Sequence, residues 1–96
     1  MLKDQPDFKL DEDTLNFWAY TLIGENHLPE ATELFKLGVQ LFPSSSNSYD
    51  SLGEAYMKAG QKQLAIDNYK KSLELNPAND DAKEKLKVLE AAPSAK

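Results

Sequence analysis

The sequence contains no cysteine, which excludes disulfide bonds, thiolate metal sites and thiol chemistry within these 96 residues. No apolar run approaches the ~20 residues that a membrane-spanning helix needs, so we expect no membrane partner. Cations are in the minority, with 11 Lys and Arg against 16 Asp and Glu and a net charge of -5. Because an acidic chain without a basic stripe binds phosphate backbones poorly, we do not expect a nucleic-acid partner.

Residues that could carry chemistry are equally scarce. His27 is the only histidine, and since a zinc site needs three or four ligands, we interpret it as a solvated turn residue. The serines at 44–46 have no base in a fixed relation to them and are expected to form a turn and cap a helix. Asp80 and Asp81 are not followed by the alternating ligands of a calcium loop. We therefore expect no enzyme activity, no metal and no cofactor.

Two successive segments of equal length, residues 12–45 and 46–79, repeat similar residue types at one constant offset. We call this offset, which leads from Ala31 to Ala65, the period. A fixed period of this length indicates a stacked repeat array, in which each unit packs only on its neighbours. Small residues in both units are expected to let helices approach closely, and large residues to fill the space between them. The matching pairs are Leu15/Tyr49, Trp18/Leu52, Ala19/Gly53, Leu22/Tyr56, Ala31/Ala65, Phe35/Tyr69 and Pro43/Pro77.

Apolar residues at helical spacing predict two helices in each unit and a fifth helix over about residues 79–90. Pro29 is expected in the first turn of the second helix, where a missing N–H costs little. Residues 1–11 are expected to be a lead-in linker, and residues 91–96 a frayed tail. The expected ends of the first four helices are Gly24, Phe42-Pro43, Gly60 and Asn76-Pro77.

The second unit closely resembles the tetratricopeptide repeat through Tyr49, Leu52, Gly53, Tyr56, Ala65, Tyr69 and Pro77. The first unit departs from that pattern, since Leu15 and Leu22 stand where aromatic residues are usual, and Ala19 and Gly38 stand where glycine and alanine are usual. The resemblance implies an all-α fold, a right-handed α-α superhelix of two helix-turn-helix repeats with a C-terminal capping helix, in one domain over residues 12–90. It also implies a non-catalytic role in protein–protein interaction or scaffolding.

A second resemblance concerns the context of the chain. Residues 35–43 and 49–56 are similar to repeat pairs found at the C-terminus of bacterial serine hydrolases of the β-lactamase-like and esterase-like kinds. This resemblance implies an alternative role, that of an accessory domain whose catalytic partner lies upstream of Met1. If the chain is instead complete, its polar start predicts no signal peptide and the default expectation is the cytoplasm.

By the same family resemblance, the first helix of each pair lines a concave groove. The acidic residues outnumber the lysines on this face, so the expected ligand is a protein or peptide segment that is basic or apolar rather than acidic. The alternative is a solvated acidic face without a dedicated ligand. The candidate groove residues are Asp13, Asn16, Tyr20, Ile23, Asn47, Asp50, Glu54, Met57, Asp81 and Glu84.

The first helix carries an aromatic cluster of Phe17, Trp18 and Tyr20. Trp18 occupies a position of the apolar stripe and is expected to pack in the core. Phe17 and Tyr20 lie off that stripe and are expected to be exposed, since no earlier repeat covers the first helix. An exposed aromatic patch indicates a missing neighbour, either an upstream domain or a second copy of the chain.

Overall fold

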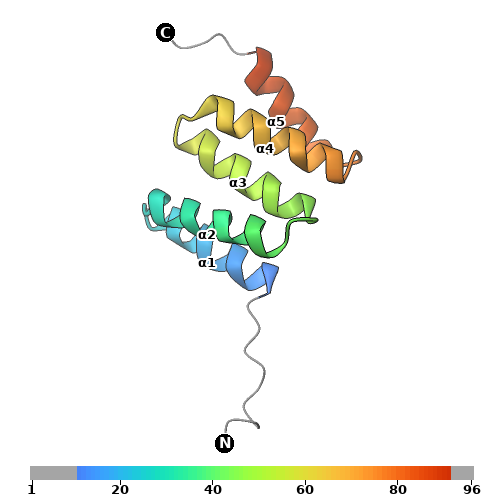
Figure 1. The fold of residues 1–96 in the computed structure, drawn as a ribbon. Coiled ribbons are helices and arrows are strands. Elements are labelled where there is room, and N and C mark those ends of the chain that lie inside the picture. Colours follow the sequence, from blue (N-terminus) through green and yellow to red (C-terminus); the bar gives the residue numbers. More distant parts are fainter. Residues whose placement is uncertain (1–10, 92–96) are drawn as a thin grey trace, which may run out of the picture.

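The computed structural model describes residues 11–91, which form five α-helices connected by short turns. Their bounds are α1 Glu12–Gly24, α2 Leu28–Leu41, α3 Ser46–Lys58, α4 Lys62–Leu75 and α5 Asp80–Ala91. Each helix packs mainly against the helix that follows it, so the molecule is a linear stack with α1 at one end and α5 at the other (Figure 1). The predicted all-α repeat fold is confirmed. Of the expected linker over residues 1–11 and tail over residues 91–96, only Asp11, the N-cap of α1, and Ala91, the last residue of α5, lie within the described residues.

The same N-cap recurs at each repeat. The side chains of Asp11, Ser45 and Asn79, each one period after the last, accept hydrogen bonds from the backbone N–H three positions later at 2.8, 3.4 and 3.2 Å. Such a cap satisfies one of the orphan donors of a helix start, and each one is worth about 1 kcal/mol. The starts of α1, α3 and α5 are therefore fixed by the residue type at one position of the period.

The turn inside each repeat also recurs at the same spacing. Gly60 has φ +79°, and Asn26, one period earlier, has φ +69°. Asparagine is one of the few residues with a side chain that enters the left-handed region readily. As predicted, α1 ends at Gly24, and the left-handed residue of this turn is Asn26, two positions later in the chain.

The core is built from small residues at the helix crossings and aromatic rings between them. Ala19, Ala31 and Ala65 are fully buried, as the repeat pairing predicted. Phe35 and Tyr69 are also buried, and a β-carbon on Gly53 would lie 3.2 Å from the Tyr69 ring. Gly53 is therefore needed for the close approach of α3 and α4.

Trp18 was predicted to pack in the core, and this prediction is wrong, because 43% of the residue is exposed. Its partner in the second repeat, Leu52, is only 5% exposed. The difference lies in the neighbours: α2 packs on α3, whereas no described element precedes α1. The expected exposure of Phe17 is confirmed, since 69% of its surface is accessible.

Candidate functional site: one face of α1, α3 and α5

Helices α1 and α3 are joined on one face by the side chain of Tyr20. Its hydroxyl donates to Glu54 Oε1 at 2.8 Å, and Ser51 Oγ lies 3.2 Å from the Tyr20 hydroxyl oxygen. The ring packs edge-on against Phe35 at a centroid distance of 5.0 Å. Burial, together with the neighbouring Glu54 carboxylate, raises the pKa of Tyr20 to about 12. Tyr20 is thus turned toward Glu54, and its hydroxyl forms a structural bond within this face.

Helices α3 and α5 are joined through Asp50. The Asn79 side chain donates to Asp50 Oδ2 at 3.3 Å and to Ser72 Oγ at 3.0 Å, while its own oxygen caps α5. Burial raises the pKa of Asp50, and the nearby Asp81 carboxylate acts in the same direction. The Asn79 hydrogen bond and the Lys85 ammonium oppose this shift in pKa. Asp50 is therefore a half-buried carboxylate whose ionised form is only partly compensated.

The Tyr69 hydroxyl lies close to the same group of acids. The residue is fully buried, and its hydroxyl has no hydrogen-bond partner among the described residues. Burial raises the pKa of Tyr69, with further contributions from Asp50, Glu54 and Asp81. An unpartnered buried hydroxyl costs about 1–3 kcal/mol, so Tyr69 of α4, packed against α3, carries an unmet donor near these acids.

Two lysines reduce the negative charge of this face. Lys58 Nζ lies 4.0 Å from Glu54, and Lys85 Nζ lies 3.3 Å from Asp81. Asp50 has no ion pair among residues 11–91 within 4.0 Å. Glu54 and Asp81 are therefore paired on this face, whereas Asp50, like the exposed Glu84, has no ion pair among the described residues.

A hollow of about 270 Å³ opens on the same face, between α3 and α5. Met57, Glu84, Lys85 and Val88 line it, and 62% of Val88 is exposed. The hollow provides an apolar contact surface next to the acidic residues. It brings two of the predicted groove residues, Met57 and Glu84, to one place.

The predicted groove residues fall into two groups in the structure. Six of them lie around the Tyr20–Glu54 contact, the Asp50–Asn79 contact or the hollow, namely Tyr20, Asp50, Glu54, Met57, Asp81 and Glu84. The others have different settings: Ile23 packs on the core, Asp13 is exposed on α1, Asn47 approaches Glu12 at 3.5 Å, and Asn16 is half-buried.

Glu12, Ser51, Asn79 and Lys85 were not predicted for this face or its supports. Glu12 accepts from Ser45 Oγ at 2.6 Å and Ser48 Oγ at 2.7 Å, which fixes the start of α1 to the turn before α3. The capping position of Asn79, one period after Ser45, was a signal in the sequence that could have identified it. The contacts of Glu12 have no such signal, whereas the i,i+4 spacing of Asp81 and Lys85 on α5 could have predicted their ion pair.

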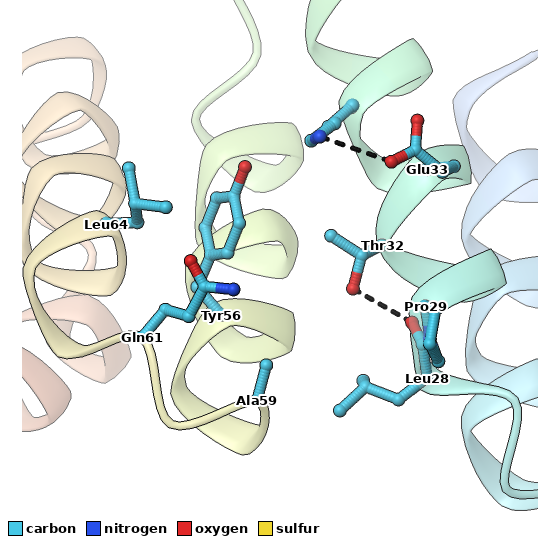
Figure 2. A pocket seen from close by; sticks show the side chains of 9 residues that line it. Leu28, Pro29, Thr32, Glu33, Tyr56, Ala59, Gln61 and Leu64 are labelled. Carbon is cyan, nitrogen blue, oxygen red and sulfur yellow. Dashed lines mark hydrogen bonds and ion pairs between the residues drawn. The ribbon is translucent and has the colours of Figure 1, made fainter.

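A second hollow, of about 320 Å³, lies between the start of α2 and the α3–α4 turn. Figure 2 shows Tyr56 between Thr32 and Pro29 on one side and Leu64 on the other. Its polar wall is already satisfied, since Thr32 donates to the Leu28 carbonyl at 2.9 Å and Lys36 pairs with Glu33 at 3.2 Å. It contains none of the predicted groove residues.

Residues suited to metal binding or membrane insertion are not gathered in the described part of the chain. No group of three or more His, Cys, Asp or Glu side chains is placed there to bind a metal ion. His27 lies in the α1–α2 turn, 4.0 Å from Glu30, with about half of its side chain exposed. Within residues 11–91 no helix is long and apolar enough to cross a membrane.

The helix pairs, their caps and the alanine–aromatic crossings define an all-α repeat protein. Residues 51–79 match the family model of the tetratricopeptide repeat. Two crystal structures of MamA share 31% sequence identity with this chain, at TM-scores of 0.73 and 0.72. Each alignment covers 92% of this chain and 50% or 46% of the MamA chain, so the chain spans about half the length of these relatives. A comparison with curated proteins found no match.

Taken with the fold, these matches identify residues 51–79 as a tetratricopeptide repeat and support the assignment of the chain to that family. They support a protein-interaction or scaffold module as its general role. The predicted similarity to modules of serine hydrolases is not tested by these matches and stays a prediction.

Proposed function

We infer that the face of α1, α3 and α5 binds a peptide segment of another protein that presents a lysine or arginine next to an apolar residue. The observation that carries this proposal is the half-buried Asp50 carboxylate, whose pKa is raised by burial and which has no ion pair within the described residues. A carboxylate in this setting is costly until a cation reaches it. A cationic side chain from a partner would supply the missing charge.

The surroundings of Asp50 favour a mixed ligand. Met57 and Val88 in the adjoining hollow offer apolar contact, and Tyr20 is held in place by its bond to Glu54. A segment with a cation and an apolar side chain can therefore satisfy both parts of the face at once. An acidic segment would meet Asp50, Glu54 and Glu84 and be repelled.

The test is titration of the protein with a Lys/Arg-rich peptide and a Glu-rich peptide of equal length, at low and high salt. We expect only the basic peptide to bind, and its affinity to fall as ionic strength rises. The variant Asp50→Asn should weaken binding about tenfold, which corresponds to about 1.4 kcal/mol. The same substitution removes a buried charge and should leave the free energy of unfolding at pH 7 equal or higher, so weaker binding would not reflect unfolding.

Asp67→Asn is the matched control, because Asp67 is exposed on α4 and lies outside this face. We expect the control variant to bind the basic peptide as the wild-type protein does. Equal weakening by both substitutions would show that only net charge matters. Binding of the Glu-rich peptide would contradict the proposal directly.

A further inference from the structure

The outer side of α1 is the surface on which a preceding repeat would pack. On α3 the corresponding positions are buried at Ser48, Ser51, Leu52 and Ala55, because α3 lies against the first repeat. One period earlier, the same positions of α1 hold Thr14, Phe17, Trp18 and Thr21. We call these four residues the α1 end face. Its two aromatic residues are 69% and 43% exposed.

The opposite end of the stack, at α5, carries charged residues on its outer side, whereas the outer side of α1 carries aromatic ones. On α5 the positions that would receive another helix hold Lys83, Lys87 and Glu90, where α3 has Tyr49, Gly53 and Tyr56. Lys83 and Lys87 are exposed and Glu90 pairs with Lys70 of α4 at 3.6 Å, so these positions offer no apolar surface to a further helix. The α1 end therefore exposes aromatic rings at interface positions, whereas the α5 end exposes charges. Only the α1 end presents a surface suited to a further helix.

Charge selects the kind of helix that fits. Residues 11–35 contain six Asp and Glu and no Lys or Arg. Asp13 and Glu25, both exposed, lie near the two ends of α1 on either side of the aromatic pair. A second copy packed antiparallel on the same face would place its Asp13 near this Glu25, and like charges would repel. A cationic helix instead meets complementary charge at both ends.

We propose that the α1 end face binds an amphipathic helix from another protein, with an apolar stripe for Phe17 and Trp18 and lysine or arginine at both ends of that stripe. This surface is separate from the face around Asp50, so the two can be occupied independently. The α2–α3 packing within the chain shows how a helix covers the equivalent positions one repeat later.

Trp18 is the only tryptophan of the chain and lies on the proposed surface, so its fluorescence reports occupancy directly. The probe is a blocked peptide of residues 28–41, the helix that covers the equivalent face, with Glu30→Lys, Glu33→Lys and Gln40→Lys, so that lysines lie at both ends of its apolar stripe. The unmodified peptide is its acidic counterpart. We expect the lysine peptide to shift Trp18 emission to the blue and protect it from acrylamide, with at least tenfold higher affinity than the unmodified peptide.

Two variants separate this surface from the Asp50 face. Phe17→Ser should weaken binding of the lysine peptide at least tenfold with an unchanged thermal midpoint, because Phe17 is mostly exposed. Asp50→Asn should leave it unchanged. Unmoved Trp18 emission, equal affinity for both peptides, or insensitivity to Phe17→Ser would overturn the proposal.

Measurements on the protein without peptide test two other occupants. A blue shift of Trp18 emission with rising protein concentration would show that a second copy covers the face. A red shift on removal of residues 1–10 would show that this segment of the chain covers it. Either result would overturn the proposal of a separate cationic helix, whereas an emission maximum independent of concentration and truncation would support it.

Discussion

The two repeats follow the same plan but differ in what surrounds their first helices. Trp18 and Leu52 occupy the same position, yet the larger tryptophan is 43% exposed and the leucine 5%. Residue type alone would order them the other way, since a tryptophan side chain gains more from burial. Burial at this position is thus set by the presence of a preceding repeat. Within a repeat array, a hydrophobic stripe predicts an interface without telling whether the interface is filled.

Local features, in contrast, are equal in both repeats. Asp11, Ser45 and Asn79 cap successive first helices, and Asn26 and Gly60 take the same left-handed backbone in successive turns. These features depend on one residue and its immediate neighbours. They survive the differences in packing because no contact with another repeat is needed to form them.

The largest difference between the two repeats is expected when Trp18 and Leu52 are each truncated to alanine. Leu52→Ala should lower the free energy of unfolding by about 2–5 kcal/mol, because it leaves a cavity between α3 and its neighbours. Trp18→Ala should cost less, about 1–2 kcal/mol, because 43% of the residue already faces solvent. Urea denaturation of the two variants measures both values. Equal losses would show that Trp18 is covered in solution.

Most of the fold could be predicted from the sequence, because helix starts, helix ends and close crossings depend on residue type at fixed spacing. All five helices and the alanine crossings at Ala31 and Ala65 were predicted in this way. Gly24 ends α1 as predicted, whereas the left-handed Asn26 could have been found only by applying the period, which leads from Gly60 to Asn26. The error at Trp18 arose because periodicity cannot show where an array ends.

Less of the candidate site could be predicted. The sequence placed Asp50, Glu54 and Met57 on one face, since they share a face of α3. It gave no sign that Glu12 accepts two serine hydroxyls, that Lys85 and Met57 line one hollow, or that the Tyr69 hydroxyl lacks a partner among the described residues. Such contacts depend on side-chain positions across helices, which are set only after the repeats have packed.

A second pair of substitutions tests the buried alanine that both repeats share, Ala31 and Ala65. Ala65→Leu should lower stability by about 1–3 kcal/mol through overpacking, and Ala31→Leu by a similar amount, since both alanines are fully buried. Ala59→Leu, at the exposed end of α3, is the control and should change little. Thermal midpoints measure all three. An unchanged midpoint for Ala65→Leu would reject the close contact of α3 and α4.

The smallest effects come from the phenol hydroxyls of the two tyrosines that lie near Glu54. Tyr20→Phe removes a hydrogen bond to Glu54 and should cost about 1 kcal/mol, whereas Tyr69→Phe removes an unpartnered buried hydroxyl and should cost nothing or raise stability by up to about 1 kcal/mol. Chemical denaturation at pH 8 distinguishes the two. A larger loss for Tyr69→Phe than for Tyr20→Phe would mean that the Tyr69 hydroxyl has found a partner.

The same variants separate the two rings in alkaline solution. Burial raises the pKa of Tyr20 to about 12 and also raises the pKa of Tyr69, whereas an unfolded tyrosine titrates near 10. The unfolded chain therefore releases these protons first, so their contribution is complete below pH 10 and is lost as pH rises toward 12. Stability measured at pH 8, 10 and 11 should fall less steeply in each Phe variant than in the wild-type protein. An unchanged slope in Tyr20→Phe would show that Tyr20 is as solvated as a free phenol, and the link between α1 and α3 on the Asp50 face would then be absent in solution.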